Sequence, residues 1–223
     1  MVSLRRLRDV GAPARAVTID TELRRAGCAF LIGALPFAQI IAKRAGRVDL
    51  RVAHPESVSA TGVYRVAGLA PFVVVAALDV VKGYAAVKLT GGNGPTLSLR
   101  AALVVVGHNW SPFARGAGGR GITPATGVLL AGGRWAAPIM LGGPVIGYLC
   151  GSSALGSFLS QLLLPFGALV LGKREHVALV TAVVLPIWAK RIAGNYLQLG
   201  VGVPLSDYLD RLLYDRDRAG SSS

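Results

Sequence analysis

The chain alternates long apolar runs with short polar or glycine-rich segments. The first clear run covers residues 26–42, the second 66–87, and a third, shorter run 97–110. From residue 122 to 192 the chain stays apolar apart from three short interruptions, at residues 132–134, 151–153 and 173–176. We expect four further helices there. A helix that crosses a membrane needs about 20 mostly apolar residues, and fewer where neighbouring helices cover its ends. The pattern therefore predicts a compact bundle of about seven transmembrane helices.

Composition agrees with a membrane protein and excludes most soluble classes. Of the 223 residues, 52% are hydrophobic and 16% are charged, with a mean hydropathy of +0.53, whereas soluble domains carry roughly 25% charged residues. The 24 Lys and Arg against 11 Asp and Glu give a net charge of +13. Because the basic residues flank the apolar runs, this charge indicates membrane topology and an anionic lipid surface, and we expect no nucleic-acid partner. We predict an all-α integral membrane protein.

The same pattern divides the chain into three parts. We expect a basic N-terminal tail over residues 1–25, a membrane domain over 26–195 and a C-terminal tail over 196–223. The basic residues of the loops place the loop after the first span on the cytoplasmic side, as in a multi-pass membrane protein. The N-terminal tail, taken alone, favours the opposite orientation, and we follow the loops.

The C-terminal tail contains a short amphipathic pattern. Apolar side chains recur there at helical spacing, at Leu205, Tyr208, Leu209, Leu212 and Leu213. Ser206 is a candidate N-cap. The spacing predicts a short helix on the membrane surface, which packs on the protein or docks a partner.

Three polar loops fall on the predicted cytoplasmic side, over residues 49–65, 107–121 and 151–157. In the second loop, glycines leave backbone N–H groups open to an anion, and Arg120 adds donors suited to phosphate. The alternative is that these glycines only allow sharp turns and close helix packing. No group of His, Cys, Asp and Glu has metal-ligand spacing, so we expect neither a metal nor another cofactor. Asp79 and Lys82, three residues apart on one predicted helix, are expected to form a structural ion pair.

Five segments in order carry a further signal: G-A-L-P-F from Gly33, D-L-R from Asp49, L-D-V-V-K-G from Leu78, G-H-N-W-S-P-F from Gly107 with G-G-R-G from Gly118, and L-G-S from Leu155. Together they resemble the motifs of the PlsY-type acyl-phosphate:glycerol-3-phosphate acyltransferases. The resemblance implies seven transmembrane helices and a cytoplasmic site formed by the three loops. It also implies transfer of an acyl group from acyl phosphate to glycerol 3-phosphate in phospholipid synthesis, without a metal.

Site residues follow from the resemblance. It implies phosphate binding by Arg65, Gly118, Gly119, Arg120 and Gly121. It implies a catalytic role for His108, which orients a loop or helps to remove the acceptor proton, with Ser57 or Ser157 replacing lost hydroxyl groups.

Several positions depart from the family pattern, and three of them lose a polar group of the motifs. Pro55 and Ala154 stand where the family has serine, and Ala117 stands where it has lysine. Two hypotheses follow: a membrane acyltransferase, or a catalytically degenerate acyltransferase-like protein that acts as a partner or lipid-binding subunit. A transporter is a weaker alternative, because the chain shows no internal repeat.

Overall fold

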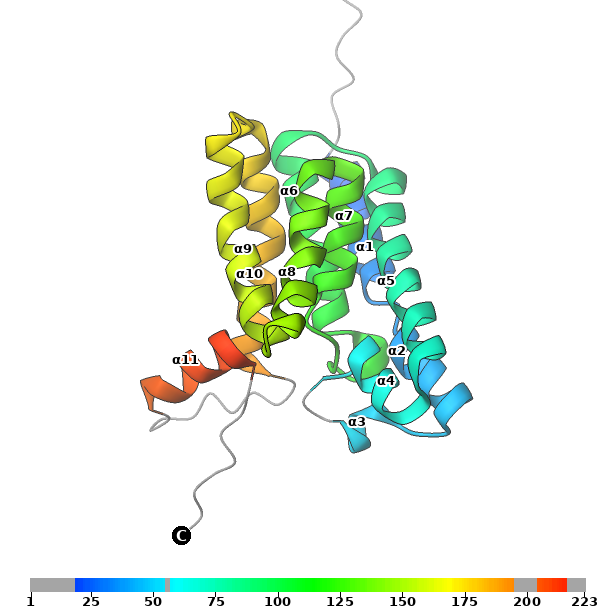
Figure 1. Ribbon diagram of the computed structural model, residues 1–223. Coiled ribbons are helices and arrows are strands. Elements are labelled where there is room, and N and C mark those ends of the chain that lie inside the picture. The colour runs from blue at the N-terminus through cyan, green and yellow to red at the C-terminus, as the bar shows by residue number, and fades with distance from the viewer. Residues whose placement is uncertain (1–18, 55–56, 195–203, 216–223) are drawn as a thin grey trace, which may run out of the picture.

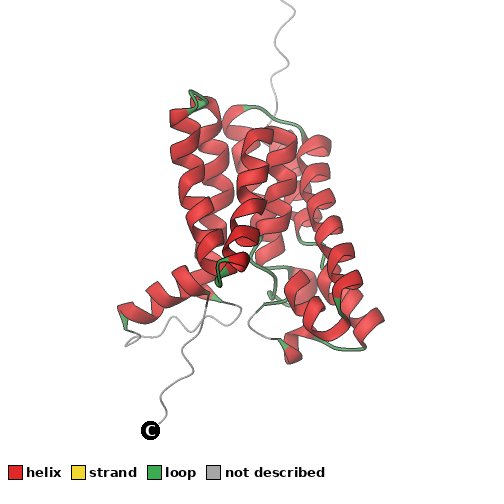
Figure 2. Cartoon of the chain, in the orientation of Figure 1, coloured by secondary structure: helices red, strands yellow, loops and turns green. Residues whose placement is uncertain are grey.

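The computed structural model describes residues 19–54, 57–194 and 204–215 (Figure 1). Within these ranges the chain forms helices and connecting turns and no β-strand, which confirms the all-α prediction (Figure 2). The longer helices are α1 (Ile19–Gly33), α5 (Leu69–Thr90), α6 (Gly94–Asn109), α7 (Ile122–Gly132), α8 (Ala137–Leu149), α9 (Ser153–Val170) and α10 (Val177–Ala193). The shorter helices are α2 (Phe37–Ile41), α3 (Leu50–Ala53), α4 (Ala60–Ala67) and α11 (Leu205–Tyr214). Four single turns complete the helical elements: η1 (Ala42–Gly46), η2 (Pro112–Ala114), η3 (Arg134–Ala136) and η4 (Arg174–His176).

Four helical segments among the described residues are long and apolar enough to cross a membrane. They are Ile19–Gly46, Leu69–Thr90, Ser153–Val170 and Arg174–Ala193. This confirms the integral-membrane class but not the predicted count of about seven spans. Beyond residue 122 the chain does form the four expected helices, α7 to α10, with breaks at the predicted interruptions. Of these four, α7 and α8 have 11 and 13 residues and are shorter than the 18 residues taken here as the minimum for a membrane span.

The first helix begins at Ile19, before the predicted start at Ala26, so the end of the predicted basic tail is helical. Its first turn carries Asp20 and Glu22, which suit the positive end of a helix. Glu22 also accepts a hydrogen bond from the buried Arg100 of α6. This long-range partner explains why polar residues continue the helix. Residues 1–18 lie outside the described part of the chain.

The predicted C-terminal helix is confirmed as α11, which lies across one end of the bundle beside α9 and α10 (Figure 1). Its N-cap is Pro204 and not Ser206. Ser206 lies inside the first turn, where its hydroxyl donates to Asp207 at 3.3 Å. The predicted cap was wrong because the helix starts at Leu205, two residues before the start at Asp207 that a cap at Ser206 requires. The preceding residues 195–203 of the predicted tail lie outside the described part.

Glycines bring α5 and α7 into direct backbone contact. A Cβ atom added at Gly83 would collide with the carbonyl oxygen of Pro124, and one added at Gly127 would collide with that of Val80. Membrane helices associate through such close packing because lipid provides no hydrophobic drive between them. The contact fixes the start of α7, and with it the end of the glycine-rich loop before it.

We predict that Gly127→Ala lowers the thermal unfolding midpoint of the purified protein in detergent, because the methyl group must push α7 away from α5. Gly142 is the matched control, a mid-helix glycine of α8 with no atom within 4 Å of an added Cβ. Gly142→Ala should leave stability unchanged or raise it by up to about 1 kcal/mol, the helix propensity difference. Equal effects of the two substitutions would contradict the packing account.

Candidate functional site

The first and second polar loops meet through a backbone hydrogen bond. The amide of Val58 donates to the carbonyl oxygen of Gly118 at 3.1 Å. Directly after Val58, Ser59 caps α4 by accepting from the amide of Gly62 at 3.5 Å. The bond therefore joins the glycine-rich loop to the start of α4.

Asp49 organises the beginning of the first loop. Its carboxylate accepts from the backbone and the guanidinium of Arg51, at 2.6–3.0 Å, and from the amide of Gln39 at 2.8 Å. The side-chain hydrogen bond from Arg51 holds the pKa of Asp49 well below its usual range, against the opposing effect of burial. The D-L-R segment thus caps α3 and links it to α2.

The glycines of the second loop fit the loop onto the end of α6. A Cβ atom at Gly118 would collide with the carbonyl oxygen of His108, and one at Gly119 would meet the His108 ring. Gly121 has φ +81° and forms the N-cap of α7, a conformation that side chains with a Cβ rarely adopt. Close packing is therefore a demonstrated role of these glycines, and anion binding by the loop stays a prediction.

His108 lies at the end of α6 beside a buried ion pair. Lys82 donates to the Asp79 carboxylate at 2.7 Å, which confirms the predicted pair, and to the carbonyl oxygen of Leu35 at 2.9 Å. Its ammonium group also lies 3.0 Å from Nδ1 of His108. An ammonium group can only donate, so Nδ1 accepts and the proton of the neutral imidazole lies on Nε2. The His108 Nε2–H group therefore faces Gly119 as a donor.

A cleft opens next to this cluster. Its lining includes Val58, Lys82, His108, Ser111, Ala117 and Gly118. The Ser111 hydroxyl donates a hydrogen bond to the carbonyl oxygen of Ala34 at 2.6 Å, which fixes the orientation of this side chain. The cleft thus lies between the two joined loops and is lined by the buried Asp79–Lys82 ion pair and the His108 imidazole.

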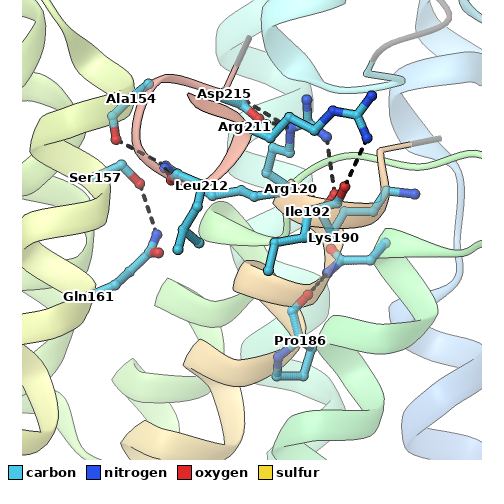
Figure 3. A network of polar contacts seen from close by, with 12 residues as sticks. Arg120, Ala154, Ser157, Gln161, Pro186, Lys190, Ile192, Arg211, Leu212 and Asp215 are labelled. Atoms are coloured by element: carbon cyan, nitrogen blue, oxygen red, sulfur yellow. Dashed lines mark hydrogen bonds and ion pairs between the residues drawn. The ribbon is translucent and has the colours of Figure 1, made fainter. Parts of the chain in front are cut away.

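Arg120 points to the other side of the same loop, toward α10 and α11 (Figure 3). Its Nε donates to the carboxylate of Asp215 at 2.8–2.9 Å, and its Nη1 donates to the carbonyl oxygen of Lys190 at 3.4 Å. The Arg120 side chain is 14% exposed. The predicted phosphate ligand is therefore paired with an internal carboxylate.

The third loop is connected to α10 and α11, the helices that Arg120 contacts, through Arg191. The Arg191 guanidinium donates to the carbonyl oxygens of Ala154, at 3.1 Å, and Leu212, at 2.8 Å. Ser152 caps α9 by accepting from the amide of Leu155 at 3.3 Å. Arg191 consequently joins the start of α9 to α11.

The remaining predicted site residues lie in different surroundings. Ser157 is buried, and its hydroxyl accepts from Gln161 at 2.8 Å, while Gln161 accepts from Trp188 at 2.9 Å. This network packs α9 against α10. Ser57 is half-buried next to Val58, and Arg65 is exposed in the last turn of α4. The structure thus gathers His108 and the glycines at the end of α6, Arg120 at α10 and α11, and Ser157 in a helix interface.

Sequence reasoning gave no site role to Lys82, Lys190 or Asp215. Lys190 belongs to none of the motifs, although a lysine inside an apolar helix is itself a signal. Asp215 lies 95 residues from Arg120, and no spacing pattern connects them. Among the described residues no group of three or more His, Cys, Asp and Glu side chains could hold a metal ion.

Known proteins resemble this chain over most of its length. Residues 26–198 match the family described as glycerol-3-phosphate acyltransferase. The glycerol-3-phosphate acyltransferase of Shouchella clausii is 31% identical over 195 residues, covering 77% of this chain and 92% of the relative. That of Halalkalibacterium halodurans is 30% identical over 179 residues, covering 78% and 81%.

Solved structures agree with the sequence relatives. The glycerol 3-phosphate form of PlsY, an integral membrane glycerol 3-phosphate acyltransferase, superposes with a TM-score of 0.70 at 25% identity, covering 89% of this chain and 94% of PlsY. Its lysophosphatidic acid form gives 0.66 at 26% identity, covering 77% and 88%. The resemblance drawn from the motifs is confirmed: this chain is an integral membrane protein that belongs to the glycerol-3-phosphate acyltransferase family.

Proposed function

We propose that this protein transfers an acyl group from acyl phosphate to a hydroxyl of glycerol 3-phosphate, at the cytoplasmic face of a bacterial membrane. Membership of the family and the names of the relatives support acyl transfer to glycerol 3-phosphate in phospholipid synthesis. A solved relative in its glycerol 3-phosphate form supports that substrate. Acyl phosphate as donor rests on the motif resemblance, and the cytoplasmic face rests on the basic loops.

One observation carries the proposal: contacts join all three polar loops at one end of the bundle. Val58 of the first loop binds Gly118 of the second. Arg120 of the second loop binds the carbonyl oxygen of Lys190. Arg191, the next residue along α10, binds Ala154 at the start of the third. Loops that are far apart in the chain therefore form one continuous polar region.

This region suits a reaction between two phosphate-bearing substrates. Acyl phosphate is an activated donor, so positioning and charge neutralisation supply much of the acceleration without a protein nucleophile. Arg120 provides a guanidinium group for a phosphate. The Nε2–H of His108 provides a donor next to Gly119, either to the loop backbone or to an anionic oxygen in the cleft. Ser57 adds a hydroxyl beside the Val58 contact, whereas the network around Ser157 supports a positioning role.

A specific observation favours a second candidate function, that of a non-catalytic partner or lipid-binding subunit. The guanidinium of Arg120 is paired with Asp215, and Pro55, Ala117 and Ala154 lack the polar groups of the family motifs. Under this hypothesis the bundle keeps its fold while the site is closed by its own carboxylate. The assay below separates the two functions.

Acyl transfer is measured with the purified protein in lipid nanodiscs, using acyl phosphate and labelled glycerol 3-phosphate. We expect lysophosphatidic acid from the native chain. Arg120→Ala should lower kcat/KM for glycerol 3-phosphate by about 10- to 100-fold, the value of a hydrogen bond to a charged group. Arg134→Ala is the control, an exposed arginine at the opposite end of α7, and should change kcat/KM less than about twofold. If the native chain forms no lysophosphatidic acid while a family enzyme is active in the same lipids, the proposed activity is refuted.

The His108 ring gives a second prediction. Glutamine places an N–H donor where Nε2 lies, whereas asparagine places one nearer Nδ1, opposite the donor Lys82. We therefore expect His108→Gln to retain more of kcat than His108→Asn, by about tenfold. Steady-state kinetics of the two variants, after confirming equal unfolding midpoints, makes the comparison. Equal loss in both, or greater activity for asparagine, would refute the assigned tautomer.

A further inference from the structure

Three basic side chains lie together behind the glycine-rich loop. Arg120 comes from the loop itself, and Lys190 and Arg191 come from the last turn of α10. Lys190 is 0% exposed and Arg191 is 2% exposed. Burying cations is costly unless anions or hydrogen-bond acceptors compensate them. The cluster therefore calls for an anion.

Lys190 is the member of this cluster whose charge is least satisfied. Its Nζ is buried without a hydrogen-bond partner among the described residues. It lies 4.9 Å from the centre of the Trp110 ring, at the point where α6 ends and the glycine-rich loop begins. The ammonium is also within electrostatic reach of Arg120 and of His108. A second cation thus lies between the Arg120 side of the loop and the His108 side.

Asp215 shows what kind of group this place accepts. Its carboxylate contacts Arg120 at 2.8–2.9 Å, and the residue ends α11 in a left-handed conformation, φ +54°. No residue of α11 is fully buried. The helix is held through the carbonyl oxygens of Leu212, which accepts from Arg191, and of Ile192, which accepts from Arg211. Because α11 is held by these few contacts, its terminal carboxylate, Asp215, is open to displacement by a stronger anion. A phosphate group offers three acceptor oxygens and more negative charge than a carboxylate.

We propose that Lys190 is a further ligand of the glycerol 3-phosphate phosphate group that the family resemblance assigns to Arg120, and that Asp215 is an internal competitor which this phosphate displaces. This inference rests on the proposed function for the identity of the ligand. Lys190 then supplies, from α10, the positive charge that the second loop lacks at Ala117. A phosphate monoester has enough acceptor oxygens to bind a guanidinium and an ammonium at once, whereas the Asp215 carboxylate pairs with the Arg120 guanidinium and leaves the Lys190 ammonium without an acceptor.

Binding is tested first without reference to catalysis. The thermal unfolding midpoint of the full chain in detergent is followed by tryptophan fluorescence against increasing inorganic phosphate, with chloride at matched ionic strength as reference. Phosphate should stabilise the native protein more than chloride. Lys190→Met, which keeps the side-chain length without the charge, should raise the half-saturating phosphate concentration about tenfold or more. Lys88→Met, at an exposed lysine of α5, is the control and should leave it unchanged.

The competitor is tested in the same assay. Asp215→Asn should lower the half-saturating phosphate concentration at least about threefold, because it removes the competing negative charge. Asp207→Asn, on the same helix but bound to Ser206, is its control. An unchanged or weaker affinity in Asp215→Asn would overturn the competitor. If Lys190→Met fails to fold, the Asp215→Asn measurement still tests the proposal. Lys190→Arg, which keeps the positive charge, should retain phosphate binding.

Acyl transfer assays separate this inference from the proposed function. If the enzyme is active, Lys190→Met should raise KM for glycerol 3-phosphate about tenfold or more with a smaller change in kcat, and Asp215→Asn should lower KM. If the enzyme is active but Lys190→Met changes neither KM nor phosphate binding, the proposed phosphate site is refuted and the proposed function stands. Phosphate binding that depends on Lys190, in a protein without activity, would keep the site and refute the acyltransferase. Stabilisation by phosphate no greater than by chloride would overturn the site whatever the activity.

Discussion

The packing of Gly118 and Gly119 against His108 is the contact on which the polar end of this protein depends. Because neither glycine carries a Cβ, the loop lies directly on the last turn of α6. That position lets the carbonyl oxygen of Gly118 accept from Val58 of the first loop, and it directs Arg120 toward α10. A larger residue at either glycine would move all three loops at once. The glycines are thus first a means of assembly, and any phosphate binding follows from the assembly.

The loop has two polar sides with different partners. On one side the Lys82 ammonium holds the His108 ring, and both line a cleft between the first two loops. On the other side Arg120 pairs with the carboxylate of Asp215 and donates to the carbonyl oxygen of Lys190, whose ammonium lies over the Trp110 ring. In a protein surrounded by lipid, such groups must find their partners within the chain, since the bilayer core offers none. A reaction between two phosphate-bearing molecules needs charge and donors close together, and this arrangement provides them on either side of one short segment.

Sequence patterns predicted what depends on local order. The apolar runs located α7 to α10 and α11, and a spacing of three residues identified the pair of Asp79 and Lys82. They did not predict that α1 starts at Ile19, because its first turn is supported by Arg100, far along the chain. The contact of Asp215 with Arg120 was missed for the same reason. The periodicity of a helix gives its length and its apolar face, but not which distant charge will meet it.

The most direct test is a structure of the full chain in lipid with glycerol 3-phosphate bound. We expect the phosphate within hydrogen-bond distance of both Arg120 and Lys190, with the Asp215 carboxylate moved away and the contact of Val58 with Gly118 retained. A phosphate bound elsewhere, for example beside Arg65, with Asp215 still paired to Arg120, would refute this phosphate site.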